Sequence, residues 1–298
     1  MDKINVKGHV ACMVAYIIFG LNIIVTKELM APGVISPLAL FCFRSIGAGA
    51  LFWLVSLLCP AEKVLRKDLL RIFFAAFTGF FLTQMSFLVA ITDITPMDCS
   101  IMSALSPIYT MLIAAVAIKE PITWKKAGGV LLSFMGVLFL IFNSVSSGGA
   151  AVTKPAGVFF MFLNGFCFSL YLGVFKPVIA RYSAITFMKW IFLFSSLMSI
   201  PFAATEIVAI DYSSFELHYI AKLLFAIVFS TFITYYLIPV GQKILRPTLV
   251  SMYSYMQPIV ATAISIYIGM DVLDFNKVVA AFTVFAGVIL VNYSRKAR

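Results

Sequence analysis

Charged residues are scarce in this chain of 298 residues. Asp, Glu, Lys and Arg together make up 11% of it, whereas they make up about 25% of a typical soluble domain. Apolar residues account for 62%, and the mean hydropathy is +1.06. Because so little charge cannot hydrate the surface of a soluble protein of this size, we expect an integral membrane protein that contacts the lipid bilayer.

Residues that carry metal, disulfide or catalytic chemistry are also few. The chain has two histidines and five cysteines, and no two cysteines have the Cys-x-x-Cys spacing of metal or redox sites. It has no His-Glu-x-x-His, Gly-x-Ser-x-Gly or Walker Gly-Lys-Ser/Thr motif. We therefore expect no metal, no cofactor and no enzymatic activity.

Long apolar runs dominate what is present. A helix needs about 20 apolar residues to cross the bilayer core, and windows of that size can be placed along the whole chain. The ten predicted spans are 8–27, 37–58, 69–92, 96–118, 124–142, 156–175, 184–204, 219–240, 247–269 and 276–293. The sequence therefore predicts an all-α membrane protein with ten transmembrane helices and short connections.

Positive charge predicts the orientation, since cytoplasmic loops are enriched in Lys and Arg. With the N-terminus inside, sixteen basic residues fall in cytoplasmic segments, and only Lys27, Lys154, Lys222 and Lys277 fall outside. We therefore place both termini in the cytoplasm and the protein in the cytoplasmic membrane. The net charge of +10 then reflects topology, and we expect no nucleic-acid partner.

The chain repeats itself with a shift of 151 residues. The segment "TPMDCSIMSALSPI" at 95–108 matches "RPTLVSMYSYMQPI" at 246–259, and the ungapped register continues to Glu120 and Asp271. Each half holds five spans, an odd number, so the second half must enter the membrane in the opposite sense. We expect two inverted five-helix repeats, residues 1–146 and 147–298, with a substrate site near the midplane between them.

At this point the sequence resembles a known family. The segment "ITPMDCSIMSALSPIYTMLIAAVAIKEPITWKKAGGVLLSFMGVLFLI" is similar to the signature of the drug/metabolite transporter (DMT) superfamily, in particular its EamA-type ten-helix permeases. The second copy at 246–291 fits less closely, with Asp271 where the family usually has Glu, and "FGLN" at 19–22 resembles the family's first-helix Trp-Gly motif. The resemblance implies a secondary transporter with alternating access, many relatives of which export amino acids or other small metabolites.

Two prolines fall near the middle of predicted spans, Pro107 in the fourth and Pro258 in the ninth. Each leaves the carbonyl four residues earlier, of Ser103 or Ser254, without its helical donor. An unpaired carbonyl costs several kcal/mol in hydrocarbon, so we expect it to face a cavity, a water or another helix. The prolines are therefore predicted hinges or kinks, although a kinked helix can also be purely structural.

Polar and aromatic residues at mid-span depth are the candidates for binding a substrate. In span nine Tyr253 and Gln257 share a helix face, as Asn164 and Tyr171 do in span six. The predicted substrate-binding residues are Asn22, Gln84, Ser103, Asn164, Tyr171, Thr231, Tyr235, Tyr253, Ser254 and Gln257. With the family resemblance, they predict a central cavity. Hydrogen bonding between helices stays open as the alternative.

Arg44 and Lys189 are the charges deepest in the predicted spans, about 12 Å and 9 Å from the nearer helix end at 1.5 Å per residue. Such cations are costly and can attract an anionic or carboxylate-bearing substrate. Alternatively, Lys189 can extend to the cytoplasmic surface and Arg44 can bond helix-end carbonyls. No acidic residue lies at mid-span, which argues against a buried carboxylate proton relay.

Small residues share one face of the fifth and of the tenth predicted span. They are Gly129, Ser133 and Gly136, and Ala280, Thr283 and Gly287. Close helix packing is the expected use of such faces, and a homodimer through them is the alternative.

The repeat, the mid-span polar residues and the resemblance together predict the function. We expect secondary transport of a small-molecule metabolite, an amino acid or a related compound, in the direction of export and by alternating access. A passive channel or facilitator is the alternative within membrane function. From a different class, the alternative is a membrane-embedded enzyme.

Overall fold

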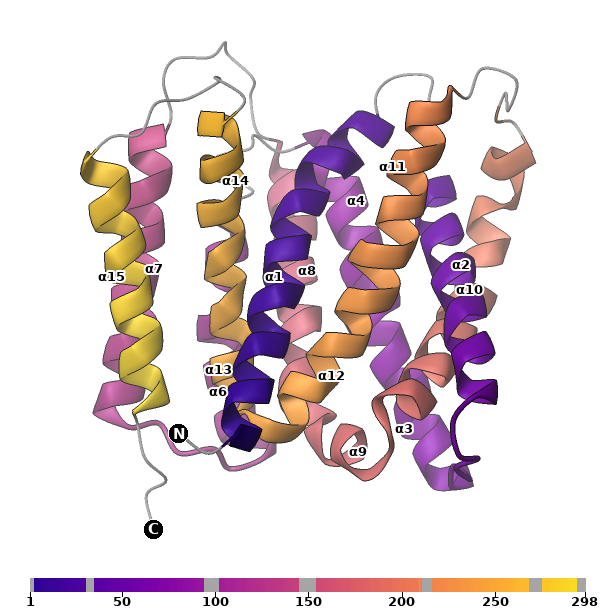
Figure 1. Cartoon of the computed structure of the whole chain (residues 1–298), viewed down its shortest axis with the longest axis horizontal. Helices are drawn as coiled ribbons and strands as arrows, with labels where there is room; N and C mark the ends of the chain where they lie inside the picture. The colour runs from indigo at the N-terminus through magenta and orange to yellow at the C-terminus, as the bar shows by residue number, and fades with distance from the viewer. Residues whose placement is uncertain are drawn as a thin grey trace.

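The computed structural model describes residues 3–30, 35–93, 102–144, 154–208, 210, 216–267 and 275–293. All regular elements in these ranges are helical, and most run side by side along one direction (Figure 1). Both chain termini lie at the same end of the bundle (Figure 1). The predicted turn at Pro96, the repeat position Asp271 and the predicted boundary between residues 146 and 147 lie outside the described residues.

The helices follow the predicted spans closely. Those of the first half are α1 (Lys3–Leu29), α2 (Pro37–Leu57), α3 (Arg66–Ala76), the π-helical turn η1 (Phe77–Leu82), α4 (Thr83–Asp93), α6 (Ser106–Ala117) and α7 (Trp124–Ser144). Those of the second half are α8 (Pro155–Val174), α9 (Lys176–Arg181), α10 (Ala184–Val208), α11 (Leu217–Ile227), the π-helical turn η3 (Val228–Ile233), α12 (Thr234–Ile244), α13 (Pro247–Met252), the 3-10 turn η4 (Tyr253–Tyr255), α14 (Met256–Tyr267) and α15 (Phe275–Asn292).

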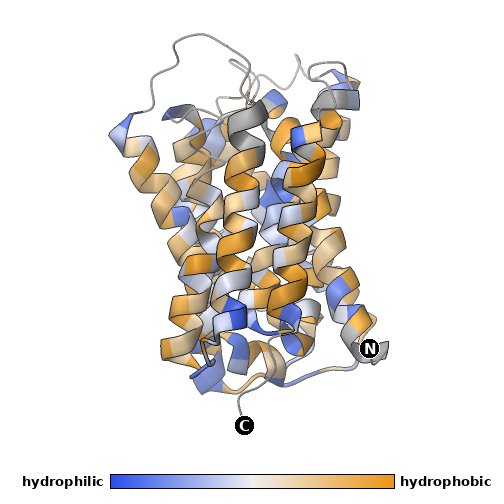
Figure 2. Ribbon diagram, turned by 90° about the vertical axis from the view of Figure 1, so that its left-hand side faces the viewer, coloured by the Kyte–Doolittle hydropathy of each residue, from blue (hydrophilic) through white to orange (hydrophobic). Residues whose placement is uncertain are grey.

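Six of the helical runs in the described residues are long and apolar enough to cross a membrane. They are Val6–Thr26, Pro37–Leu57, Arg66–Ile91, Pro155–Val174, Ala184–Val208 and Leu217–Ile244. Two shorter apolar helices are Met102–Ala117 and Val278–Asn292. Hydrophobic residues cover much of the outside of the helices (Figure 2), while polar side chains such as Thr110, Ser169 and Gln242 are fully buried. The expectation of an all-helical membrane protein is confirmed.

Local sequence sets where these helices begin and end. Pro37 is the first residue of α2, where its missing N–H costs nothing, and Ser36 caps the helix by accepting a hydrogen bond from the Ala39 N–H at 3.2 Å. Helix α6 ends where Lys119 adopts a left-handed φ of 53°. The Glu120 N–H then bonds the Ala114 carbonyl in the last turn of the helix at 3.1 Å.

The two halves match element by element. The run α3–η1–α4 covers residues 66–93, and α11–η3–α12 covers residues 217–244, with every internal boundary shifted by the same 151 positions. Packing repeats as well, since α4 and α6 pack on α8 as α12 and α14 pack on α1. Helix α2 packs on its own counterpart α10, and α7 on its counterpart α15.

The small-residue faces of α7 and α15 pack against each other. A Cβ added to Gly129 would lie 2.7 Å from the Gly287 carbonyl oxygen, so glycine allows the two backbones to approach. Between these helices Ser133 Oγ donates to the Val284 carbonyl at 3.0 Å. The predicted close packing therefore occurs within one chain, and a homodimer through these faces would have to displace it.

Candidate functional site

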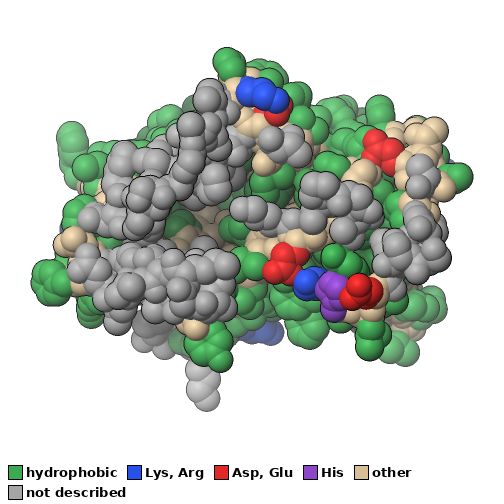
Figure 3. All heavy atoms as spheres, turned by 90° about the horizontal axis from the view of Figure 1, so that it is seen from above, with side chains coloured by type: hydrophobic (Ala, Val, Ile, Leu, Met, Phe, Trp, Pro, Cys, Tyr) green, Lys and Arg blue, Asp and Glu red, His purple; other side chains and the backbone are tan. Residues whose placement is uncertain are grey.

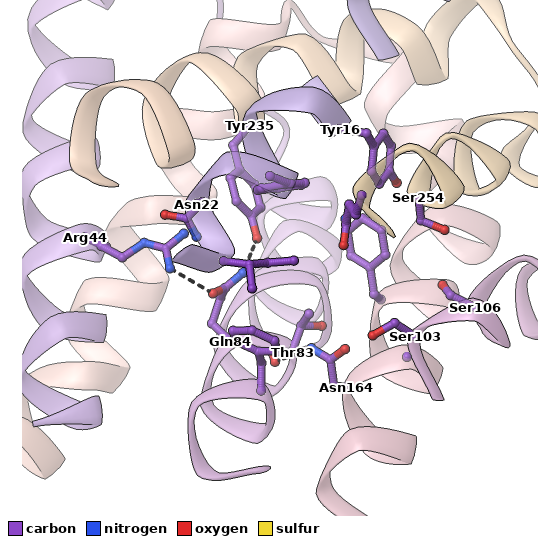
Figure 4. A pocket seen from close by; sticks show the side chains of 16 residues that line it. Tyr16, Asn22, Arg44, Thr83, Gln84, Ser103, Ser106, Asn164, Tyr235 and Ser254 are labelled. Atoms are coloured by element: carbon purple, nitrogen blue, oxygen red, sulfur yellow. Dashed lines mark hydrogen bonds between the residues drawn. The ribbon is translucent and has the colours of Figure 1, made fainter. Parts of the chain in front are cut away.

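A pocket lies between the two halves and draws its lining from both (Figure 4). Its volume is about 120 Å³. Its lining residues are Tyr16, Phe19, Asn22, Ile23, Arg44, Thr83, Gln84, Phe87, Ser103, Ser106, Asn164, Gly165, Phe168, Tyr235, Ser254 and Gln257. Polar groups and aromatic rings therefore share the same cavity, as is typical of small-molecule sites.

The two π-helical turns shape this pocket from opposite halves. A π turn widens the helix by one residue and frees a carbonyl from its usual i+4 donor. Here a threonine hydroxyl takes over, because Thr83 Oγ1 donates to the Thr78 carbonyl at 2.7 Å and Thr234 Oγ1 donates to the Phe229 carbonyl at 2.8 Å. Thr231 donates in the same way to the Ala226 carbonyl at 2.7 Å. Gln84 and Tyr235, the second residues after the two turns, line the pocket.

Gln84 and Tyr235 occupy equivalent positions in the two halves and bond each other. Gln84 Nε2 donates to the Tyr235 hydroxyl at 2.8 Å across a sequence separation of 151. Ser45 and Ser196, also 151 apart, have their hydroxyl oxygens 3.1 Å from each other. Two equivalent residues of a repeat can contact each other only near the pseudo-twofold axis that relates the two halves. The pocket therefore lies near that axis.

Arg44 lies at one side of the pocket and is 2% exposed. Its Nε donates to Thr231 Oγ1 at 2.9 Å. Its Nη1 donates to Gln84 Oε1 at 3.3 Å (Figure 4). The guanidinium is thus held by the π turn of the second half and by the glutamine that follows the π turn of the first. Its position depends on both halves.

Aromatic side chains hold Tyr235 in place. The rings of Phe19, Phe80 and Phe192 lie 5.8, 5.0 and 5.6 Å from the Tyr235 ring between centroids, each edge to face. Such packing fixes the ring and leaves the hydroxyl to find polar partners. Tyr235 is accordingly 2% exposed, with its oxygen at the Gln84 amide.

Several buried polar atoms of the pocket lack a hydrogen-bond partner among the described residues. They are the Tyr16 hydroxyl, Asn22 Oδ1 and Ser254 Oγ. Tyr16 is 1% and Asn22 is 6% exposed. A buried polar group without a partner costs about 1–3 kcal/mol, so a molecule that bonds these atoms in the pocket would gain that energy.

Seven of the ten predicted substrate-binding residues line this pocket. They are Asn22, Gln84, Ser103, Asn164, Tyr235, Ser254 and Gln257. Asn164 also anchors itself by donating from Nδ2 to the Thr83 carbonyl at 2.7 Å. Their contact with a substrate stays a prediction.

The other three predicted residues lie outside the lining. Thr231 bonds Arg44 and so positions the guanidinium. Tyr253 has its hydroxyl 2.6 Å from His9 Nδ1. Tyr171 is 2% exposed and its ring lies against Gly79, where an added Cβ would be 2.3 Å from Tyr171 Cδ2. These three side chains therefore contact other residues of the protein and do not line the pocket.

The two predicted intramembrane charges have different surroundings. Arg44 lines the pocket, whereas Lys189 Nζ lies 4.9 Å from the centroid of the Trp53 ring, away from the lining, as a cation–π pair. The predicted kinks are local changes of helix type. Pro258 follows the 3-10 turn η4, and Pro107 opens α6 after a turn in which the Leu105 N–H bonds the Met102 carbonyl at 3.2 Å.

Some lining residues were not among the predicted ones. Tyr16, Phe19 and Ile23 share a face of α1 at helical spacing, a signal that could have identified them beside Asn22. Ser106 was missed because its contacts with α8 leave no sign in the sequence: Ser169 Oγ donates to its carbonyl at 3.1 Å, and Thr110 Oγ1 lies 2.9 Å from Ser169 Oγ. That network also joins α6 to α8.

Helices of this length around a polar pocket between two matching halves define a membrane protein that handles a small molecule. The family model of the EamA-like transporter family matches residues 6–142 and 155–293. The chain therefore belongs to the EamA-like transporter family of the DMT superfamily, and it is a multi-pass membrane transporter, not an enzyme.

Related proteins agree with this membership. The chain is 22% identical to the "Uncharacterized transporter YetK" of Bacillus subtilis, over 99% of this chain and 89% of that protein. It is 23% identical to an "Uncharacterized transporter" of Archaeoglobus fulgidus, over 67% and 68% of the two chains. A solved structure aligns with a TM-score of 0.76 at 16% identity, over 96% of this chain and 95% of the other, which supports the fold.

Proposed function

We propose that this protein is a secondary transporter that moves a small polar or amphipathic metabolite, an amino acid or a related compound, out of the cytoplasm by alternating access. The observation that carries the proposal is the position of the pocket. It lies where Gln84 and Tyr235, equivalent residues of the two halves, meet. A site between repeats becomes accessible to one side or the other when the repeats rock about it.

The proposed topology follows the sequence argument. Ten transmembrane helices form two inverted repeats, residues 1–146 and 147–298. The protein lies in the cytoplasmic membrane, with both termini in the cytoplasm. The excess of Lys and Arg in the segments on the side of the termini supports this orientation. Duplicated π turns at matching depth support a two-repeat mechanism, since such turns are frequent at functional sites.

Counterflow in liposomes tests the proposal. Purified protein is reconstituted, the liposomes are loaded with an unlabelled metabolite, and uptake of the labelled compound is followed for a panel of amino acids and organic acids. We expect saturable exchange for at least one of them. Flux that neither saturates nor exchanges would identify a passive channel, and no flux for any compound in folded protein would refute transport.

A matched pair of variants ties the flux to the pocket. Gln257 lines the pocket, so Gln257→Ala should raise the half-saturation concentration by roughly three- to tenfold, the loss of about one hydrogen bond. Asn292 lies exposed at the end of α15, so Asn292→Ala should leave the value unchanged. Equal behaviour of the two variants would remove Gln257 from the site.

A further inference from the structure

Arg44 is a buried cation without an anionic partner in the described part of the chain. Its two hydrogen bonds go to the neutral oxygens of Thr231 and Gln84, and no carboxylate oxygen of a described Asp or Glu lies within ion-pair distance of it. Its Nη2 makes no hydrogen bond with a described residue. An uncompensated charge at this depth is costly, and it favours binding of an anion beside it.

The groups around Arg44 are arranged as donors. Tyr235 accepts a hydrogen bond from Gln84 at 2.8 Å, so its own O–H remains available to donate. Asn22 is 6% exposed and lies beside Arg44 (Figure 4). Guanidinium and phenol together fit a carboxylate, whose two oxygens accept several hydrogen bonds.

The remainder of the pocket suits an apolar body. Phe19, Phe87 and Phe168 line it, and among the described lining residues there is no Asp or Glu. An ammonium group would therefore find no carboxylate there. One water, a single non-hydrogen atom, needs about 10–15 Å³ of cavity volume. The cavity of about 120 Å³ therefore holds roughly ten non-hydrogen atoms.

We propose that the pocket binds organic monocarboxylates with a compact apolar body, with the carboxylate on Arg44 Nη2 and the Tyr235 O–H, and that it prefers them to zwitterionic amino acids of the same shape. This substrate class rests on the proposed transport function and, of the compounds named there, selects carboxylates related to amino acids over amino acids themselves. The site selects for net negative charge because Arg44 supplies the only charge among the described lining residues.

Matched ligands test the charge preference directly. Hydrocinnamate is phenylalanine without its ammonium group, and hydrocinnamamide is the same acid with its charge removed. Binding of each to the purified full chain in nanodiscs is measured by calorimetry, together with the smaller acids acetate and isocaproate. We expect hydrocinnamate to bind at least about tenfold more tightly than the amide or phenylalanine, the effect of one charge-assisted pair. Equal affinities for acid and amide, or no binding of any of the three acids, would overturn the proposal.

Two variants assign the preference to Arg44. Arg44→Gln removes the charge, and Gln84→Glu keeps Arg44 but places a carboxylate of nearly the same shape at the position now 3.3 Å from Nη1. Both should reduce hydrocinnamate affinity at least about tenfold and abolish the difference between acid and amide. Since Gln84→Glu creates an internal ion pair, it should remain folded even if Arg44→Gln does not. Unchanged affinity in Gln84→Glu would refute the assignment.

The control is the other intramembrane cation. Lys189 lies on Trp53, away from the pocket lining, so Lys189→Gln should bind hydrocinnamate as the unmodified protein does. Binding and flux separate the two proposals. Arg44-dependent binding without counterflow would refute transport and keep the anion site, whereas counterflow of neutral compounds that is indifferent to Arg44→Gln would keep transport and refute the anion site.

Discussion

The two ends of the helix bundle hold the two halves together in different ways. At the end that carries both termini, which we call the terminal end, the contacts are made by buried carboxylates. Asp68 on α3 is 1% exposed and pairs at 2.5 Å with Arg181 of α9, whose side chain is 48% exposed, and it accepts a hydrogen bond from the Tyr182 hydroxyl at 2.7 Å. One carboxylate of the first half thus binds two residues of the second.

An ion pair with both side chains buried also lies at the terminal end. Lys126 Nζ on α7 lies 2.9 Å from Glu120 Oε1, and their side chains are 1% and 5% exposed. Thr248 on α13 donates to Glu120 Oε2 at 3.3 Å, which again joins the first half to the second. Glu120 reaches this place because the left-handed Lys119 ends α6 just before it.

At the opposite end, the ion pairs that the structure describes are open to solvent. Lys154 and Asp93 lie 2.6 Å apart with side chains 67% and 27% exposed, and Lys222 and Glu28 lie 2.5 Å apart, 30% and 49% exposed. Seen from this end, charged side chains form small separate groups (Figure 3). Exposed pairs contribute about 0–1 kcal/mol, whereas breaking a buried pair costs about 3–5 kcal/mol. Removing a partner from the buried carboxylates of the terminal end should therefore cost more than removing one at the opposite end.

The largest effect is expected for Lys126→Ala. It leaves Glu120 buried without its cation, so the free energy of unfolding should fall by about 3–5 kcal/mol. Denaturant unfolding in detergent micelles, followed by tryptophan fluorescence, measures it. The matched change at the opposite end, Lys154→Ala, should cost less than about 1 kcal/mol.

A double variant separates charge from packing at the same place. Replacing both partners, Glu120→Gln with Lys126→Met, removes the unpaired charge and keeps the side-chain volume, so it should recover most of the loss. If Lys126→Ala and Lys154→Ala cost the same, or the double variant recovers nothing, buried charge is not what distinguishes the two ends.

A smaller effect is expected for Asp68→Asn. The amide keeps the shape and can still accept from Tyr182, but it loses the charge that binds Arg181, so about 1–3 kcal/mol should be lost in the same assay. Asp93→Asn, whose partner Lys154 is exposed, is the control at the opposite end. A loss that is larger for Asp93→Asn would reverse the comparison.

The repeat was readable in the sequence because both copies keep their prolines and serines in register, and the helices follow the apolar windows. The π turns were not, since nothing in "FTGFFL" at 77–82 or "VFSTFI" at 228–233 differs from ordinary helix. The first of them carries a contact between helices, the ring of Tyr171 on Gly79, that no local pattern records.

The sequence predicted how deep in the membrane the site residues lie, but it predicted less well which neighbouring helix each side chain faces. Helical spacing gives the face of a helix, and Asn22, Gln84 and Gln257, chosen in this way, line one cavity. It cannot tell which neighbour that face meets, so Tyr253, which bonds His9, was grouped with them. The bond between Arg44 and Thr231 joins residues 187 positions apart, and no local pattern records such a pair.

The smallest effect tests whether the contacts of the terminal end stabilise the fold because they are buried or because of where they lie. Glu62 lies there but is only partly buried, and its carboxylate accepts a hydrogen bond from the Ser183 N–H at 2.9 Å. Burial alone would raise the pKa of Glu62, but hydrogen bonds from Ser183 and Thr186 and the charge of Lys243 outweigh it and hold the pKa below the ordinary 4.5. The charged form is therefore the one that stabilises the folded state.

Since the folded pKa of Glu62 is depressed, its contribution is complete above about pH 4.5 and is lost as the pH falls through the folded pKa. Glu62→Gln should thus lower the free energy of unfolding by less than about 1 kcal/mol between pH 6 and 8, and the difference should shrink toward zero as the pH falls through the folded pKa. Thermal unfolding of both proteins across this pH range measures it. A loss as large as that of Lys126→Ala would mean that location at the terminal end, rather than burial, sets the strength of its contacts.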